Sequence, residues 1–118
     1  MLTLSWMKCG NGTNWCPLDI VNLSGVTTFG VYIIWHEGNP GRVVRVGQGA
    51  IADRLGCHKE DREVLAYAAR GKLRVTWAVV SERLADGVER YLAEHWKPLV
   101  GARFPDVAPL EVNSPFAS

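Results

Sequence analysis

The chain has 118 residues, of which 47% are hydrophobic, and this is typical of one globular domain that buries about two-thirds of its unfolded surface. The formal net charge of +1 excludes a protein that attracts polyanions through its overall charge alone. No stretch approaches the roughly 20 apolar residues of a membrane span, and the first residues lack the apolar run of a signal peptide. We expect a single domain over residues 1–118, located in the cytoplasm and without a membrane partner.

The charge is uneven along the chain. Residues 41–83 hold nine cationic and five anionic side chains, a net charge of +4, and the remaining residues carry a net charge of −3. A basic stretch of this kind is compatible with contacts to a phosphate backbone, although most charged surfaces are only solvated.

Three cysteines, Cys9, Cys16 and Cys57, are present. An odd number argues against a closed disulfide framework and for a reducing compartment. Together with His58 they offer zinc ligands, but their spacing differs from the two to four residues of a zinc knuckle. We do not expect a zinc site.

Residues 1–27 form an N-terminal extension in which the weak alternation of residues 2–8 indicates an edge strand, followed by a loop rich in glycine and asparagine. From Thr28 to His36 apolar residues occupy both faces, which predicts a central strand covered on both sides. The turn EGNPGR then leads into a second strand, Val43–Val46, so that the two strands form an antiparallel hairpin.

Gly47, Gln48 and Gly49 are expected to end the second strand, and residues 50–55 to form a short helix that Gly56 terminates. Asp61 is the expected N-cap of a helix over residues 62–70. The apolar face predicted for that helix consists of Val64, Leu65 and Ala68.

A third central strand is predicted at Leu73–Val80, which is rich in β-branched and aromatic residues. Ser81 is the expected cap of a helix that ends at Pro98. The stripe that this helix turns toward the sheet is Leu84, Val88, Tyr91, Leu92 and His95, with Glu89 at its edge.

Residues 100–118 should form an irregular tail packed on the domain. The predicted fold is therefore α+β, with a small, mainly antiparallel sheet of about three strands flanked by helices.

Within this background lies an ordered set of short motifs. Gly30-Val31-Tyr32 is followed by Arg45-Val46-Gly47, then by Arg54 and His58 four residues apart, and finally by Glu89 on an amphipathic helix. The set resembles the GIY-YIG nuclease family, and the resemblance covers roughly residues 28–98. The chain departs from the family where Arg45 stands at a position that usually holds tyrosine.

The resemblance implies hydrolysis of DNA phosphodiester bonds with one divalent cation, commonly Mg²⁺, with Mn²⁺ as the other candidate. It implies catalytic roles for Tyr32, Arg45, Arg54 and His58 and a metal ligand in Glu89. The supporting residues that it suggests are Gly30, Gly47 and Asn113, and we add Lys59 and Arg62 as substrate contacts.

The residue types suit this chemistry. The carboxylate of Glu89 is a hard oxygen ligand of the kind that Mg²⁺ prefers. The planar guanidinium of Arg54 can hold a phosphate by two charge-assisted hydrogen bonds. Tyr32 is the candidate general base, although a free phenol has a pKa of about 10 and needs activation. His58 can relay a proton or orient the base.

Arg45 has no accessible proton to lose, so it cannot replace a tyrosine as an acid or base. It can instead lower the pKa of Tyr32 or bind phosphate, provided that both residues face the same side of the hairpin. The alternative is a catalytically impaired module that binds nucleic acid or a protein partner. Because the chain has no recognisable sequence-reading motif, target choice would depend on the structure of the DNA, on a partner protein or on a homodimer.

Overall fold

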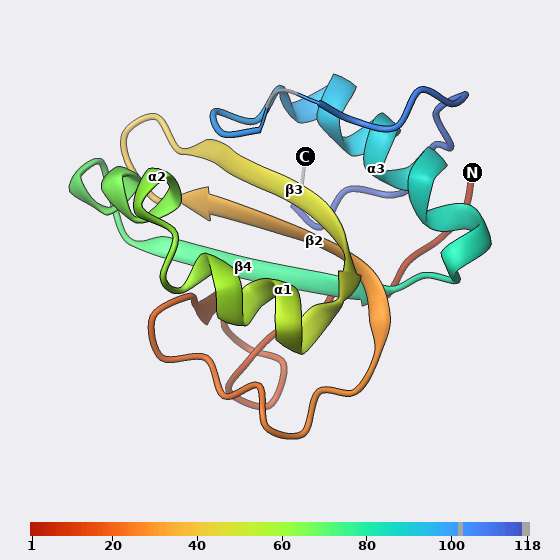
Figure 1. Ribbon diagram of the computed structural model, residues 1–118. Coiled ribbons are helices and arrows are strands. Elements are labelled where there is room, and N and C mark those ends of the chain that lie inside the picture. The colour runs from red at the N-terminus through yellow and green to blue at the C-terminus, as the bar shows by residue number, and fades with distance from the viewer. Residues whose placement is uncertain (102, 117–118) are drawn as a thin grey trace.

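Four antiparallel strands form one sheet at the centre of the computed structural model, which describes residues 1–101 and 103–116 (Figure 1). The strands are β1 (Cys16–Pro17), β2 (Phe29–His36), β3 (Arg42–Ala50) and β4 (Leu73–Val79). Their order across the sheet is β1-β4-β2-β3. β2 is therefore central, between β3 and β4, as its apolar residues on both faces predicted. β3 lies at an edge.

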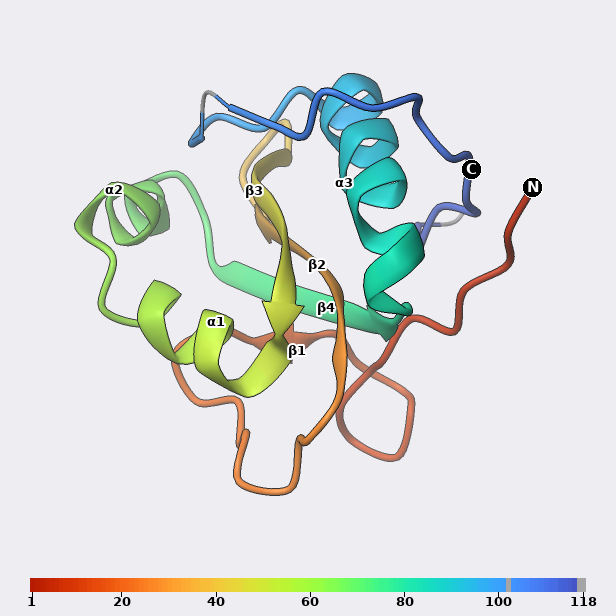
Figure 2. The same ribbon diagram turned by 45° about the vertical axis from the view of Figure 1, so that its right-hand side comes forward.

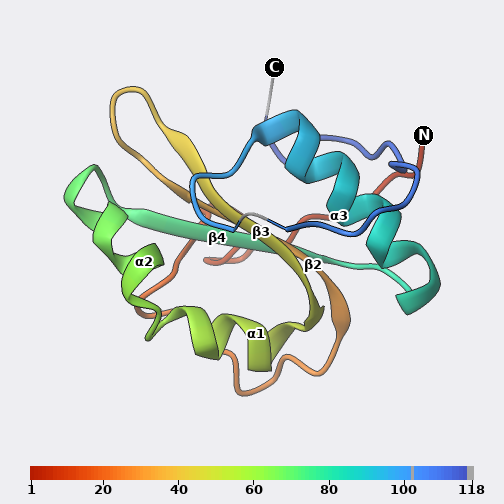
Figure 3. The same cartoon turned by 45° about the horizontal axis from the view of Figure 1, so that its top comes forward.

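Helices cover both faces of the sheet, which confirms the predicted α+β fold. α1 (Ile51–His58) and α2 (Arg62–Leu65), which continues as the 3-10 helix η1 (Ala66–Ala69), lie on one side. α3 (Glu82–Trp96) lies on the other side (Figures 1 and 3). Within the residues that the structure describes, no helix is both long enough and apolar enough to cross a membrane.

Each face of β2 contributes to its own apolar core. Val31, Ile33 and Trp35 pack with residues of α3, whereas Tyr32 and Ile34 pack with residues of α1. All five side chains are buried. Because successive side chains of a strand point to opposite faces, the position of a residue in β2 decides which helix it meets.

Two predicted boundaries on either side of residue 50 are wrong. β3 does not end at Val46 but continues through the glycines to Ala50, because Gly47 and Gly49 pair with Tyr32 and Gly30 of β2. α1 does not end at Gly56 but continues to His58. The C-cap of α1 is Lys59 instead of Gly56.

The prediction for Asp61 is confirmed, since its side chain caps α2 by accepting hydrogen bonds from the N–H groups of Glu63 and Val64. The helix expected over residues 62–70 is divided between α2 and η1. Val64 is buried as predicted, whereas Leu65 is 36% exposed. Ser81 precedes α3, but its side chain makes no capping hydrogen bond.

The edge strand predicted at residues 2–8 is absent from the described structure, and the two-residue β1 takes the edge beside β4. Residues near the two termini instead lie together on the α3 side (Figure 2). Leu2 forms an isolated parallel bridge with Val112. The side-chain amide of Asn113 accepts a hydrogen bond from Leu4 N at 2.6 Å and donates one to Leu4 O at 3.0 Å. The C-terminal tail thus packs on the domain through residue 116.

Cys9 and Cys16 form a disulfide, contrary to the expectation from the odd number of cysteines. Backbone hydrogen bonds between Cys9 and Asn14 close a turn that brings the two cysteine Cα atoms to 5.0 Å, within bonding range. Cys57 is the cysteine left over, and it is exposed.

Candidate active site

The phenol ring of Tyr32 lies on the α1 face of the sheet, in a space left by Gly47. The two residues are register partners on β2 and β3, so they belong to the same face. A Cβ atom at position 47 would collide with the ring and the hydroxyl oxygen of Tyr32. Tyr32 has no exposed surface. Gly47 is therefore required for the packing of this ring.

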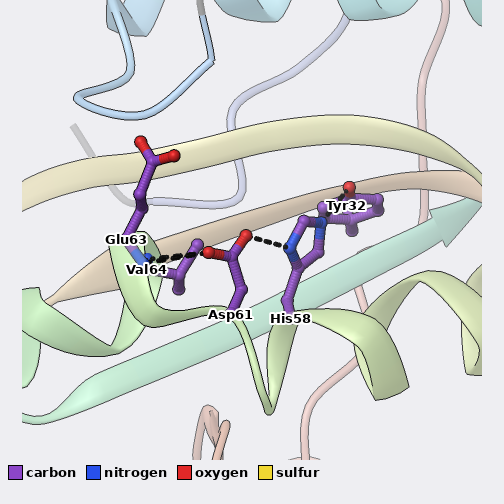
Figure 4. A network of polar contacts seen from close by, with 5 residues as sticks. All are labelled: Tyr32, His58, Asp61, Glu63 and Val64. Carbon is purple, nitrogen blue, oxygen red and sulfur yellow. Dashed lines mark hydrogen bonds and ion pairs between the residues drawn. The ribbon is translucent and has the colours of Figure 1, made fainter.

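His58, the last residue of α1, meets the phenol hydroxyl from another side. Its Nε2 atom lies 2.6 Å from Tyr32 Oη, and its Nδ1 atom lies 3.4 Å from Oδ2 of Asp61. The other carboxylate oxygen of Asp61 accepts from the N–H groups of Glu63, at 3.0 Å, and Val64, at 3.5 Å. A row of polar contacts thus runs from the phenol to the N-terminus of α2 (Figure 4).

The direction of proton donation along this row follows from the pKa values. Burial raises the pKa of Tyr32, and the adjacent arginines only partly offset it, so the phenol is protonated at neutral pH. Burial and the charge of Arg45 lower the pKa of His58, so the imidazole is neutral. Tyr32 therefore donates to Nε2 of His58, which leaves the imidazole proton on Nδ1, facing Asp61.

The carboxylate of Asp61 stays ionised. Its burial acts to raise its pKa, but the N–H groups of Val64 and Glu63, together with His58, outweigh this and leave the pKa lowered. An anion is thus held beside Nδ1 of His58, where it favours a positive charge on the imidazole.

Two guanidinium groups lie beside the phenol. Arg45 belongs to β3, where the side chains at positions 45, 47 and 49 lie on the same face of the sheet as Tyr32. Arg54 of α1 passes over Gly49, where a Cβ atom would lie 2.8 Å from Arg54 Cγ. The φ angle of Gly49, +138°, also favours glycine there. Both positive charges lower the pKa of Tyr32, against the larger effect of burial.

Arg45 carries an unsatisfied donor. The side chain is half-buried, and its Nε atom is buried without a hydrogen-bond acceptor among residues 1–101 and 103–116. A buried N–H group without an acceptor costs about 1–3 kcal/mol. An oxyanion bound beside Arg45 would supply the missing acceptor.

Glu89 reaches the same region from α3, on the opposite face of β3. Its Oε1 atom accepts a hydrogen bond from Nε2 of Gln48 at 2.8 Å, and the same Nε2 donates to Oδ1 of Asp86 at 2.6 Å. Burial and the neighbouring charge of Asp86 raise the pKa of Glu89, whereas Gln48, Arg45 and Arg54 act to lower it. Glu89 is thus a half-buried carboxylate within the field of both arginines.

The structure brings together the five side chains to which the sequence assigned chemistry. Tyr32, Arg54 and His58 lie on the α1 face, and Arg45 lies on the edge strand beside them. Glu89 belongs to the α3 face, yet the charges of Arg45 and Arg54 act on both Glu89 and Tyr32. The five side chains therefore lie on both faces of the sheet at the edge strand β3.

The other predicted residues differ in their placement. Gly30 is required for backbone packing, because a Cβ atom there would collide with the carbonyl of Ala78. Lys59 uses its ammonium group to donate to the carbonyl oxygen of Val21 at 2.8 Å. Arg62 is exposed at the start of α2. Asn113 joins Leu4 through two hydrogen bonds, and its bracing role stays a prediction.

Sequence reasoning did not include Gln48, Asp61 or Asp86 in the site. Asp86 could have been found, because it precedes Glu89 by three residues and so shares a helix face with it. Asp61 was expected only as a helix cap. Gln48 gave no signal, since β3 was predicted to end before it.

Comparisons of the chain with models of known families, with curated proteins and with solved structures find no match. Within the described residues, no three histidine, cysteine, aspartate or glutamate side chains are grouped as metal ligands.

We predict that Gly47→Ala destabilises the protein by about 1–3 kcal/mol, because the added methyl group must displace the buried ring of Tyr32. Gly56→Ala is the matched control. Its Cβ atom meets nothing within 4 Å inside α1, so it should be neutral or stabilise by up to about 1 kcal/mol. Urea unfolding measures both values, and equal stability of the two variants would contradict the proposed packing.

Stability should fall as the pH drops below about 6.5. The pKa of His58 is lowered in the folded state, so the unfolded chain binds a proton more readily, and the stabilisation present above pH 6.5 is lost on acidification. Urea midpoints at pH 7.5 and 5.5 measure the loss. His58→Gln should reduce this pH dependence. Equal dependence in wild type and His58→Gln would contradict the protonation scheme.

Proposed function

We propose that the protein is a divalent-metal-dependent endonuclease of the GIY-YIG type that hydrolyses phosphodiester bonds of DNA at a single site. The observation that carries the proposal is the buried hydrogen bond from Tyr32 to His58, with the charges of two arginines and of Glu89 close by. Hydrolysis of a phosphodiester needs a proton acceptor for the attacking water and positive charge for the phosphoryl oxygens.

The proton acceptor is the Tyr32–His58 pair. As the phenol oxygen takes a proton from the attacking water, its own proton passes to Nε2 of His58, 2.6 Å away. The imidazole becomes cationic, and the ionised Asp61 facing Nδ1 stabilises it. This relay removes the need for a free phenolate, which the raised pKa of Tyr32 disfavours.

Arg54 and Arg45 hold the scissile phosphate. Arg45 contributes an Nε–H group that has no acceptor in the described structure and that a phosphate oxygen would satisfy. Because Tyr32 is fully buried in the free protein, substrate binding has to shift a neighbouring group, and Arg45 on the edge strand is the one we assign. The substitution of tyrosine by arginine thus preserves activity through phosphate binding.

The metal ligand is Glu89, with Asp86 beside it. Their carboxylates converge on one amide group of Gln48, and the charge of Asp86 acts to raise the pKa of Glu89, so the pair suits a cation. Oxygen ligands of this kind favour Mg²⁺ or Mn²⁺ over zinc. When bound, the cation stabilises the charge that develops on the leaving oxygen. Gln48 fixes the orientation of both carboxylates.

We propose DNA as the substrate and the cytoplasm as the compartment, with target choice provided by a partner protein or by dimerisation. The disulfide between Cys9 and Cys16 would be reduced in the cytoplasm. The turn between these cysteines is also closed by backbone hydrogen bonds between Cys9 and Asn14, which do not involve the sulfur atoms.

The second candidate function is a module of the same kind that binds nucleic acid or a protein without cleaving it. Two observations favour it, the complete burial of Tyr32 and the presence of Arg45 instead of a second tyrosine. Both candidate functions use Arg45 and Arg54 to bind a phosphate group, so a measurement of DNA cleavage distinguishes them.

The test is nicking of supercoiled, branched and single-stranded DNA in Mg²⁺ by wild type and by Glu89→Gln. We expect the variant to lose at least about a hundredfold in rate, since several kcal/mol of charge stabilisation are removed. Glu94→Gln is the control, because Glu94 lies on the same helix but pairs with Arg90 at 2.8 Å, and it should nick normally. Wild type that binds these DNAs but nicks none would overturn the nuclease proposal in favour of the binding module.

A further inference from the structure

A cavity lies at the turn of the β2–β3 hairpin, lined by described residues other than those of the candidate active site. Its volume is about 350 Å³. The side chains that define its chemistry are His36, Asn39, Arg42, Tyr67, Arg70 and Leu99. Among residues 1–101 and 103–116, no aspartate or glutamate lines it. The cavity therefore presents cationic and neutral donor groups without a built-in anion.

The two arginines of the cavity are not paired with carboxylates in the described structure. Arg42 begins β3 and Arg70 follows η1, and neither forms a salt bridge among residues 1–101 and 103–116. Glu37, the carboxylate next to His36 in sequence, is bound instead by Arg74 at 3.0 Å. Two guanidinium groups from distant parts of the chain thus face one cavity without a counter-ion.

His36 adds a neutral donor between these charges. Its side chain is 4% exposed, and its Nδ1 atom accepts a hydrogen bond from Gly38 N at 3.1 Å, which leaves the proton on Nε2. Burial and then the charges of Arg70 and Arg42 lower the pKa of His36, and all three side chains line the cavity. The ring stacks on Tyr67, with 5° between the planes, which fixes its orientation.

The walls of the cavity are held by backbone packing. A Cβ atom at Gly71 would collide with the backbone of Glu37 and Gly38, so the hairpin turn and the segment after η1 pack backbone to backbone. Glu37 N also donates to Lys72 O at 2.9 Å. The backbone segments that carry Arg42 and Arg70 are therefore packed beside one cavity before any ligand binds.

We propose that this cavity binds a phosphate group of the DNA strand, a few nucleotides from the scissile phosphate. The inference rests on the proposed nuclease function for the source of the phosphate, whereas the recognition chemistry rests on the cavity alone. Arg42 and Arg45 of β3 lie opposite His36 and Ile34 of β2 across a β-bulge, which places their backbones about 7 Å apart along the strand. A short run of nucleotides spans this distance.

The first experiment tests whether the bound phosphate belongs to DNA. It uses the full chain with Glu89→Gln, so that DNA binding is measured without cleavage. Arg42→Ala and Arg70→Ala should each weaken DNA binding and reduce the slope of log affinity against log salt by about one. Arg90→Ala is the control, because Glu94 already compensates its charge, and its slope should be unchanged. Wild-type slopes in both cavity variants would overturn the proposal.

The second readout is independent of DNA and of catalysis. Inorganic phosphate should shift the ring resonances of His36 in NMR spectra, whereas the same ionic strength of sodium chloride should not. The shift should be lost in the Arg42→Ala, Arg70→Ala double variant and kept in Arg90→Ala. Persistence of the shift in the double variant would overturn the cavity as an anion site. Wild type that passes both tests but cleaves no DNA would refute the nuclease function and leave the phosphate cavity standing.

Discussion

The hydrogen bond between Tyr32 and His58, buried on one face of the sheet, is the contact on which the arrangement of the site depends. It requires glycine at position 47, because any side chain there would occupy the space of the phenol. It also requires α1 to continue past Gly56, since His58 is the last residue of that helix. The capping of α2 by Asp61 then places an anion behind the imidazole. One polar pair thus ties together β2, β3, α1 and the start of α2.

The edge position of β3 lets groups from both faces of the sheet meet. Positions 45, 47 and 49 serve the face of Tyr32, whereas Gln48 points to the other face and holds Glu89. The chain after α3 covers part of the same edge, where Leu99 N and Val100 N donate to the carbonyls of Val43 and Val44. The next residue along the chain, Gly101, lies beside the guanidinium group of Arg45. The candidate site therefore begins where the covered part of the edge ends.

Patterns that arise from local chemistry were predictable. The central strand, the N-cap Asp61 and the position of Glu89 at the edge of a helical stripe all follow from short-range periodicity and capping. The extent of β3 could not be predicted in this way. Two glycines indicate the end of a strand unless it is known that the neighbouring strand β2 packs against them. The bond between Cys9 and Cys16 depends on a turn closed by backbone hydrogen bonds, and the convergence of Gln48 with Asp86 depends on register. Contacts of this kind cannot be predicted from the spacing of residues along the sequence.

The measurement that tests the central claim most directly is DNA nicking by Tyr32→Phe. This change removes only the hydroxyl group and leaves the ring in its place over Gly47, so thermal unfolding should show that the variant remains folded. If Tyr32 accepts the proton of the attacking water and passes its own to His58, the variant should bind DNA like the wild type and lose nicking by about a hundredfold or more. Nicking at the wild-type rate by the folded variant would contradict the account.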